Sequence, residues 1–351
     1  MTYVDLLGKD LITTQEWTRE ELDFTLEVAK DLKRRYYTGN LPEILKNKTF
    51  FMLFYNTSTR TRASFEAAMT ALGGHAQFID ISTTRAGEGE APKDIARMYE
   101  RYGHGLGIRI LENAVDYVYG RGNAVVREYA KWAKIPVINM ADDMFHPAQG
   151  LTDIMTVQEK FPRYENKKYV IMWAYAAPSL RSWCSIQEEM LIMTRYGLDV
   201  VLAYPPGFDL DPKIVEWAKQ NADQYGGSLE ISHDYKEALE GAHIVFPRGW
   251  ASHKFVMEIA PKAAKEGPDA MKAAKAKEIE LHNKYKDWRL TMDLLDIMAK
   301  NKIIMHVMPV FRGREADDEV MDSEYSAIID QAENRLHAQM GILAVTMGGK
   351  Y

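Results

Sequence analysis

Cysteine is almost absent from this sequence. Its 351 residues include one cysteine, Cys184, so no disulfide can form within a chain and a cysteine-based metal site is excluded. The first ten residues contain acidic side chains and no apolar core, unlike a secretory signal. No apolar run approaches the roughly 18 residues that span a bilayer. We therefore expect a cytoplasmic protein with no membrane partner.

Excess positive charge and several diagnostic motifs are also missing. The net charge is -6, which argues against nucleic-acid binding, because phosphate contacts over a wide surface need clustered Lys and Arg. The nine histidines are scattered without an H-E-x-x-H pattern, so no metal site is expected. No G-x-G-x-x-G turn follows an apolar run, which disfavours a nicotinamide dehydrogenase. The absence of a G-x-S-x-G elbow argues against an α/β hydrolase.

The sequence does contain a regular alternation of apolar runs and amphipathic segments. Such runs are typical of parallel strands buried on both faces. We predict strands at residues 49–55, 75–81, 105–111, 136–140, 169–175, 199–205, 228–232, 243–248, 302–309 and 327–330. We predict helices after a capping box at Thr18–Glu21 and at residues 62–73, 92–102, 123–134, 181–196, 212–225, 258–285 and 332–346. The pattern indicates an α/β fold with two doubly wound parallel-sheet domains and a boundary near residues 160–168.

One stretch of the second half, residues 262–288, is rich in lysine and glutamate. Charge runs on a helix generally face solvent. We interpret this stretch as a solvated helix face with no direct role in a site.

The densest polar stretch, NTSTRTR at residues 56–62, follows the first apolar run. Ser58, Thr59 and Thr61 supply hydroxyl donors, and Arg60 and Arg62 supply forked charged donors. Ligands of open parallel sheets bind beyond the carboxyl ends of strands, and N–H groups at a helix start favour anions. The stretch therefore predicts a phosphate site, although it is not a Walker loop. The alternative is a helix cap flanked by surface arginines.

Other predicted strand ends carry matching groups. Arg109 lies in an apolar strand and needs an anionic partner, either a ligand or a structural salt bridge. His146 and Gln149 follow the strand at 136–140 and could together polarise a carbonyl oxygen, although a His-Pro pair in a loop is weak evidence alone. Arg335 is predicted in the first turn of the final helix. A cation there opposes the helix dipole, so a bound anion would explain it.

Together these segments resemble the carbamoyltransferase family, which includes aspartate and ornithine carbamoyltransferases. The matching motifs are STRTR, GEAPKDIAR, GIR, HPAQ, HVMP and AENRLHAQ, at residues 58–62, 89–97, 107–109, 146–149, 306–309 and 332–339. They follow the family order and span nearly the whole chain. Segments at residues 169–179, 193–205, 226–252 and 320–339 resemble the knotted subgroup, which includes N-acetylornithine and N-succinylornithine carbamoyltransferases. This resemblance implies a trefoil knot in the second domain.

The resemblance implies that the anion is carbamoyl phosphate and that no metal or organic cofactor takes part. Residues 1–155 would form the carbamoyl-phosphate-binding domain and residues 156–331 the amino-acid-binding domain, with a C-terminal helix at 332–351 packing back on the first. An amine would attack the carbamoyl carbon while fixed donors stabilise the oxyanion, and the leaving phosphate would accept the amine proton. The implied catalytic residues are Arg60, Arg109 and His146. The implied carbamoyl-phosphate ligands are Ser58, Thr59, Arg60, Thr61, Arg109, His146, Gln149 and Arg335.

The resemblance also implies a homotrimer whose active sites are shared between subunits. The segment at residues 82–94 would be the loop that enters the neighbouring site, where Arg85 or Lys93 could reach the phosphate. The alternative is an ordinary exposed loop.

The amine acceptor is less defined. Ornithine enzymes carry a D-x-x-x-S-M-G segment that is absent here, and Arg248 stands where acetylornithine enzymes have a lysine. An arginine can hold a substrate carboxylate with two parallel bonds; the alternative is a surface ion pair. The residues Val307, Met308 and Pro309 belong to the HVMP motif, in which Val307 replaces the usual cysteine.

Three carboxylates bear on the acceptor as well. Glu315 aligns with a lysine that is carboxylated in the acetylornithine enzymes, so it retains a negative charge there. Together with Asp142 and Asp143 it would suit a free amine on the substrate, unless the two aspartates only cap a loop. We expect transfer to the side-chain amine of ornithine, an N-acylornithine, lysine or another diamino acid. The alternative is a non-catalytic homologue that binds carbamoyl phosphate or phosphate in a regulatory role.

Overall fold

The computed structural model describes residues 4–85 and 89–348, and these residues form two compact units. The first unit comprises the described residues within Met1–Val115, Gly120–Met155 and Glu333–Tyr351. The second comprises Asp116–Tyr119 and Thr156–Ala332. Each unit has its own parallel sheet, which confirms the predicted α/β class with two parallel-sheet domains.

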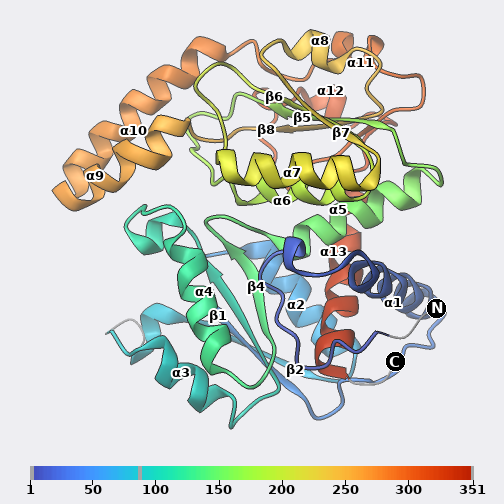
Figure 1. The fold of residues 1–351 in the computed structure, drawn as a ribbon, viewed down its shortest axis with the longest axis vertical. Coiled ribbons are helices and arrows are strands. Elements are labelled where there is room, and N and C mark those ends of the chain that lie inside the picture. The colour runs from blue at the N-terminus through green and yellow to red at the C-terminus, as the bar shows by residue number, and fades with distance from the viewer. Residues whose placement is uncertain (1–3, 86–88, 349–351) are drawn as a thin grey trace. The chain divides into compact units, whose positions relative to one another are not determined.

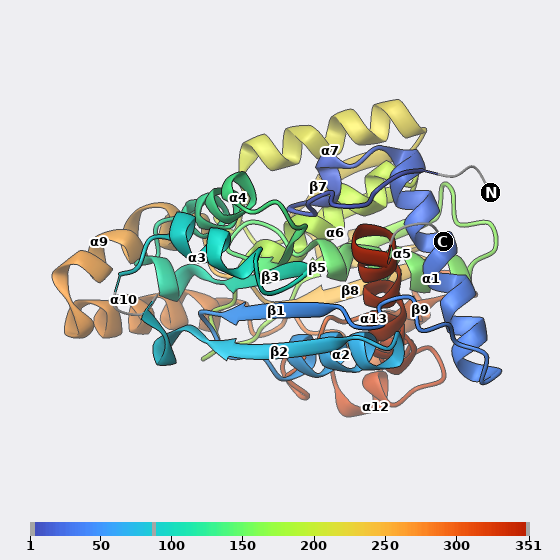
Figure 2. The ribbon, with the colours of Figure 1, turned by 90° about the horizontal axis from the view of Figure 1, so that it is seen from below.

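The sheet of the first unit has four parallel strands in the order β2-β1-β3-β4 (Figures 1 and 2). Figure 1 shows α3 and α4 on one face of this sheet and α2 and α13 on the other, with α1 beside α13. The strands are β1 (Thr49–Phe54), β2 (His75–Asp80), β3 (Gly105–Ile110) and β4 (Val137–Asp142). The helices are α1 (Arg19–Tyr37), α2 (Thr59–Ala71), α3 (Pro92–Tyr99), α4 (Arg121–Trp132), α5 (Pro147–Lys160) and α13 (Ile328–Leu343).

The sheet of the second unit has five parallel strands in the order β7-β6-β5-β8-β9. Within this unit α6 and α7 cover one face (Figure 1). Every residue of α6 is buried. The strands are β5 (Lys168–Trp173), β6 (Asp199–Ala203), β7 (Ser228–Ser232), β8 (Ile244–Arg248) and β9 (Ile303–Ile304). The helices are α6 (Cys184–Arg195), α7 (Pro212–Tyr225), α8 (Tyr235–Leu239), α9 (Ala260–Glu266), α10 (Pro268–His282), α11 (Met292–Asp296) and α12 (Asp318–Met321).

Local sequence signals account for several helix boundaries. The capping box before α1 is present, because the Thr18 side chain accepts the Glu21 N–H and the Glu21 side chain accepts the Thr18 N–H. The helix α7 begins with Pro212 after the Asp211 cap and ends at Gly226, whose φ of 82° suits glycine. These signals explain why the predicted range for α7 matches the structure.

Two predicted strands are wrong or too long. Residues 327–330 are not a strand, because α13 already begins at Ile328. The predicted strand at 302–309 is only Ile303–Ile304, and the HVMP motif follows it as a loop. Short apolar runs fit a helix and a strand equally well, which is why periodicity failed at 327–330. As a consequence Arg335 lies in the middle of α13, and the helix-dipole argument for a bound anion no longer applies.

One helical prediction also needs correction, and several helices were not predicted. The helix expected at 258–285 is interrupted at Gly267, which has a φ of 110° and is followed by Pro268 at the start of α10. The helix α5, which begins directly after His146, was not predicted. The short helices α8, α11 and α12 were missed as well.

The expected burial of the strands on both faces fails at two sheet edges, although β4, which is also an edge strand, is fully buried. The strands β2 and β7 lie at sheet edges, and most of their residues are exposed or partly exposed. In the described part of the chain, no helix is both long and apolar enough to cross a membrane.

Candidate active site

The sheet order of the first unit marks the place where a ligand is expected. The strand β1 lies between β2 and β3, so the chain leaves its carboxyl end in one direction and returns on the other side. Ligands of open α/β sheets bind at such a switch point, beyond the carboxyl ends of the strands. The end of β1 leads into the NTSTRTR stretch, and Arg109 is the penultimate residue of β3.

The helix α2 begins inside the NTSTRTR stretch. Ser58 is its N-cap, and the Ser58 hydroxyl oxygen accepts the Thr61 N–H at 3.3 Å. The predicted helix cap is therefore present. The first N–H groups of a helix have no partner within the helix and attract anions, so a cap at this position does not oppose phosphate binding.

Arg335 joins three segments of the first unit that the sequence keeps apart. Its Nη1 donates to Gln149 Oε1 at 2.5 Å, and its Nη2 donates to Thr61 Oγ1 at 2.8 Å. The same Nη2 lies 2.9 Å from Nε2 of His146. An arginine has only donors, so His146 Nε2 must accept and its ring proton lies on Nδ1. Four of the predicted carbamoyl-phosphate ligands are thus in direct contact.

The environment of His146 keeps its imidazole neutral. Burial, together with the charges of Arg335 and Arg109, holds the pKa of His146 well below its usual value. Its Nδ1 is buried and has no hydrogen-bond partner among the described residues. The geometry therefore presents an uncharged N–H donor close to two guanidinium groups. Such a donor can polarise a carbonyl oxygen without adding a third positive charge.

A carboxylate orients the Gln149 amide. Gln149 Nε2 donates to Asp153 Oδ1 at 2.7 Å, which leaves the amide oxygen toward Arg335. Both Gln149 and Asp153 are buried in α5. Sequence reasoning missed Asp153, although its spacing of four residues from Gln149 on one helix face is a readable signal.

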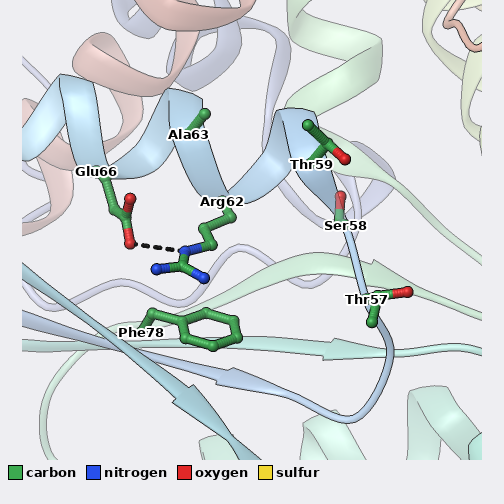
Figure 3. A pocket seen from close by; sticks show the side chains of 7 residues that line it. All are labelled: Thr57, Ser58, Thr59, Arg62, Ala63, Glu66 and Phe78. Carbon is green, nitrogen blue, oxygen red and sulfur yellow. Dashed lines mark hydrogen bonds and ion pairs between the residues drawn. The ribbon is translucent and has the colours of Figure 1, made fainter.

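The two arginines of the NTSTRTR stretch have different surroundings. Arg62 donates to Glu66 Oε1 at 3.0 Å, and its guanidinium lies 3.8 Å from the ring centroid of Phe78 (Figure 3). Arg60 makes no ion pair with a described carboxylate, and burial lowers its pKa. The charge of Arg60 therefore remains available, whereas Arg62 is engaged within the unit.

A surface pocket lies at the start of α2. It has a volume of about 440 Å³. In Figure 3 the hydroxyl groups of Ser58 and Thr59 stand at the helix start, and Arg62 lies between Glu66 and Phe78. The lining residues are Thr57, Ser58, Thr59, Arg62, Ala63, Glu66 and Phe78.

The two aspartates before His146 shape the turn that carries it. Asp142 accepts the backbone N–H groups of Met144 and Phe145 at 2.7 and 2.6 Å, as well as two side-chain amides. Asp143 Oδ1 accepts the Asn123 N–H at 3.0 Å, and burial raises the Asp143 pKa. These contacts agree with the alternative that the aspartates cap a loop. The role of Asp143 toward a substrate remains a prediction. Asn123, which contacts both aspartates, was not predicted.

The second unit has its own switch point, between β5 and β8. Arg248 is the last residue of β8 and is paired with Trp173 of β5. Its Nε and Nη1 atoms are buried and have no hydrogen-bond partner among the described residues. Among the described residues Arg248 forms no ion pair, so the alternative of a surface ion pair is not seen there. A half-buried guanidinium with free donors at a switch point is suited to an anionic group of a ligand.

Glu315 is fully buried and its oxygens are engaged by the second unit itself. They accept the N–H groups of Gly249 at 3.0 Å and Phe311 at 2.8 Å, and Arg181 Nη2 donates at 3.2 Å. Nε2 of His306 lies 3.4 Å away. Burial acts to raise the pKa of Glu315, but His306, Arg181 and the Gly249 N–H together lower it. Glu315 is therefore an ionised carboxylate inside the unit, and its predicted contact with a substrate amine remains a prediction.

The HVMP loop is held by its histidine. The Met308 N–H donates to Nδ1 of His306 at 2.8 Å, and the His306 N–H donates to Gln331 Oε1 at 2.8 Å. Val307 is buried, Met308 is partly exposed and Pro309 is exposed. The motif thus presents Met308 and Pro309 at the surface of the second unit.

The predicted subunit loop at residues 82–94 is described in part, because residues 86–88 lie outside the described residues. Arg85 is exposed. The Lys93 ammonium lies 4.1 Å from the ring centroid of Trp132, a cation–π contact within its own chain. Across residues 4–85 and 89–348, no group of three or more His, Cys, Asp or Glu side chains is placed to hold a metal ion.

Comparison with known proteins fits this geometry. Residues 9–159 match the family model of the aspartate/ornithine carbamoyltransferase carbamoyl-P binding domain, and residues 181–346 match that of the Asp/Orn binding domain. The anabolic ornithine carbamoyltransferase of Pyrococcus furiosus is 35% identical over 346 residues, covering 99% of this chain and 98% of that protein. The N-acetylornithine carbamoyltransferase of Xanthomonas campestris pv. campestris is 33% identical over 355 residues, covering 97% and 98%.

Two solved structures match this chain over nearly its whole length. The ornithine carbamoyltransferase from Pyrococcus furiosus superposes with a TM-score of 0.84 at 35% identity, over 99% of this chain and 100% of that one. An acetylornithine transcarbamylase complexed with acetylcitrulline gives a TM-score of 0.85 at 32% identity, over 97% and 99%. The matched models cover most of the chain, and the predicted motifs are in place. The chain therefore belongs to the aspartate/ornithine carbamoyltransferase family.

Proposed function

We propose that this carbamoyltransferase moves the carbamoyl group of carbamoyl phosphate to the side-chain amine of an amino acid and releases phosphate. The observation that carries the proposal is the contact of Arg335 with Thr61, Gln149 and His146. It gathers donors for an anion and a carbonyl at the switch point of the first sheet. A related acetylornithine enzyme was solved with carbamyl phosphate and N-succinyl-L-norvaline, which supports these substrate classes.

In this proposal the phosphate binds at the start of α2, with Ser58, Thr59, Arg60 and Thr61 as donors. The carbamoyl oxygen faces Arg109, Thr61 and the Nδ1–H of His146. A neutral amine attacks the carbamoyl carbon, and the oxyanion that develops is stabilised by these fixed donors. The C–O bond to phosphate then breaks, and the departing phosphate takes the amine proton. Most of the acceleration comes from positioning and electrostatics, with no covalent enzyme intermediate.

The acceptor carboxylate is assigned to Arg248, because its buried Nε and Nη1 have no partner among the described residues. The acceptor is ornithine, an N-acylornithine, lysine or another diamino acid. The carboxylates of Asp143 and Glu315 accept hydrogen bonds from their own units, which weakens the argument for a free α-amine on the acceptor. Val307, Met308 and Pro309 are proposed to line the acceptor side.

A homotrimer with shared active sites, in which Arg85 or Lys93 reaches the neighbouring phosphate, is part of the proposal and rests on family resemblance. The knot rests on the same resemblance. A cytoplasmic location is proposed because a single cysteine cannot form an intramolecular disulfide. The alternative of a non-catalytic regulatory homologue is disfavoured by the complete set of Arg60, Arg109, His146, Gln149 and Arg335.

The deciding experiment measures phosphate release from carbamoyl phosphate across a panel of amines. The panel contains ornithine, lysine, diaminopropionate, putrescine, N-acetylornithine, N-succinylornithine, aspartate and oxamate. Turnover with at least one side-chain amine is expected. Calorimetric binding of carbamoyl phosphate without turnover of any amine would favour the regulatory alternative instead.

A further inference from the structure

The segment that follows Arg248 in the second unit, Gly249–Ser252, is fixed by buried side chains along its whole length. The Trp250 and Ala251 carbonyls accept the indole N–H groups of Trp173 and Trp183, each at 2.9 Å. The Trp250 indole donates to the Phe208 carbonyl at 2.8 Å. Two indoles thus hold two carbonyls of a segment that belongs to no helix or strand, and the segment's own indole anchors its side chain.

One end of this segment is tied to Glu278 of α10. The Ser252 N–H donates to Glu278 Oε1 at 2.6 Å, and the Ser252 hydroxyl donates to Oε2 at 2.8 Å. Nε2 of His282 lies 3.1 Å from Oε1. Glu278 is 4% exposed and His282 is fully buried, in a stretch predicted to be a solvated helix face. That prediction is wrong for these two residues.

A buried carboxylate is costly unless donors satisfy it. Here the donors come from Ser252 and His282, so the burial of Glu278 is coupled to the position of Ser252. Glu280, two residues along the same helix, is exposed. The helix therefore turns one particular glutamate inward onto the segment.

The other end of the segment is tied in the same way. The Gly249 N–H donates to the buried Glu315 at 3.0 Å. An added Cβ at Gly249 would lie 2.4 Å from the Ala176 Cβ and 2.6 Å from the Ala174 carbonyl oxygen, so the backbone packs too closely for any side chain. Both ends of the segment are thus held by carboxylates, directly after the arginine whose guanidinium has free donors.

We propose that Glu278 is a positioning residue for the amine acceptor. By holding Ser252 it fixes the segment Gly249–Ser252 and, through it, the direction of the Arg248 guanidinium. The inference rests on the proposed function of Arg248 as the ligand of the acceptor carboxylate. Glu278 belongs to the lysine- and glutamate-rich stretch. In sequence it lies at least 29 residues from every residue that the motifs assigned to the site.

The test compares Glu278→Gln with Glu280→Gln, the same substitution on the exposed side of α10. In Glu278→Gln one of the two hydrogen bonds from Ser252 faces an amide NH2 group, which cannot accept it, in place of a carboxylate oxygen. Because a hydrogen bond to a carboxylate is stronger than one to a neutral amide, we expect about a tenfold higher KM for the acceptor. The KM for carbamoyl phosphate and kcat should remain within about twofold of the wild type. Glu280→Gln should change none of these constants.

Two milder variants guard against misfolding. Ser252→Ala removes only the hydroxyl bond to Glu278 and should raise the acceptor KM less than Glu278→Gln does. Ser252→Thr keeps the hydroxyl, so its acceptor KM should stay close to the wild-type value. An unchanged acceptor KM in folded Glu278→Gln overturns the inference. So does a parallel change of kcat and both KM values, because that pattern indicates a general structural defect.

Amide hydrogen exchange separates this inference from the proposed function. Exchange in a peptide covering residues 248–256 should accelerate in Glu278→Gln, while the peptides of β5 and β6 should exchange as in the wild type. Unaltered exchange there overturns the inference whether or not an acceptor is found. A wild type that turns over no amine, with faster exchange in the variant, overturns the proposed function and the acceptor role, yet retains Glu278 as the anchor of the segment.

Discussion

The guanidinium of Arg335 donates to Thr61 Oγ1 at 2.8 Å, although 274 residues separate the two in the chain. Through the same side chain Thr61 is linked to His146 and Gln149. On the carbamoyl-phosphate side of the proposed site, Thr61, His146 and Gln149 therefore share one hydrogen-bond partner, Arg335. Removing Arg335 should affect all three residues together.

Arg335→Lys tests this coupling. A lysine ammonium cannot reproduce the planar fork that reaches Gln149, Thr61 and His146 at once. Each lost charged hydrogen bond contributes about 1.5–3 kcal/mol, so kcat/KM for carbamoyl phosphate should fall about 100-fold or more. Steady-state phosphate release measures the change. The control is Arg34→Lys, since Arg34 is 77% exposed and pairs with Asp31 on α1. Equal effects of the two variants would refute the coupling.

The two arginines of the NTSTRTR stretch should differ sharply. Arg60→Gln removes a donor assigned to the departing phosphate, and loss of such a transition-state donor costs about a hundred- to a thousandfold in kcat. Arg62→Gln loses a partly exposed pair with Glu66, which contributes less than about 1 kcal/mol to stability. Its turnover should stay within a few fold of the wild type. A comparable loss of turnover in both variants would contradict the separate roles.

Arg248→Gln should affect the acceptor alone. The neutral amide loses the charge that holds a carboxylate, so the acceptor KM should rise about 10- to 100-fold. The binding constant of carbamoyl phosphate, measured by calorimetry without acceptor, should be unchanged. Acceptors without a carboxylate, such as putrescine, provide an internal control, because their kinetics should not respond to the substitution. A uniform loss across all amines would count against this role.

Gly249→Ala should destabilise the second unit. The new methyl group would lie 2.4 Å from the Ala176 Cβ, and overpacking of this kind costs about 1–3 kcal/mol or more. Calorimetric unfolding should show a lower melting temperature. In contrast, Gly348→Ala places its methyl group no closer than 3.8 Å to the Leu45 side chain, and its effect should remain within about 0.5 kcal/mol. A neutral Gly249→Ala would show that the backbone there can move apart.

The pH dependence of stability should carry a contribution from Asp10. Burial raises the pKa of the Asp10 carboxyl to about 6, although the Val137 N–H acts to lower it and Glu16 adds to the rise. An unfolded Asp titrates near 3.9, so between about pH 4 and pH 6 the folded chain binds more protons than the unfolded chain. Stability from this group is then largest at low pH and declines as the pH rises through that window.

Asp10→Asn removes this decline. Relative to the wild type, the free energy of unfolding of the variant should rise by about 1 kcal/mol between pH 4.5 and pH 7, allowing for partial exposure of the carboxyl. Urea unfolding at the two pH values measures the difference. Asp5→Asn, at an exposed aspartate of the same segment, serves as the control. A stability difference between Asp10→Asn and the wild type that is the same at both pH values would exclude the effect.

The sequence predicted the elements whose signals are local. The apolar runs of β1, β3, β5 and β8 and the capped helix α7 follow from periodicity and end residues. The motif residues on the carbamoyl-phosphate side were predicted through family resemblance, and Arg335, Thr61, His146 and Gln149 do lie together. The strand predicted at residues 327–330, where α13 begins, was wrong because a pair of isoleucines fits a strand as well as a helix when only the sequence is known.

The groups that sequence reasoning missed are those that act through contacts between distant segments. Asn123 bonds to Asp142 and Asp143 across about 20 residues, and Glu278 bonds to Ser252 across 26. Neither has a motif of its own, because a buried amide or carboxylate is indistinguishable in sequence from an exposed one. Only the packing shows that their polar atoms point inward.

The division of the chain has a consequence for its synthesis on the ribosome. The first unit is completed by residues from Glu333 onward, after the second unit has been translated. A nascent chain that ends before Arg335 has the start of α2 but lacks the guanidinium that joins Thr61, Gln149 and His146. In the proposed function, carbamoyl phosphate should therefore meet all of its donors only when the residues of both units have been made, so an unfinished chain should not turn it over.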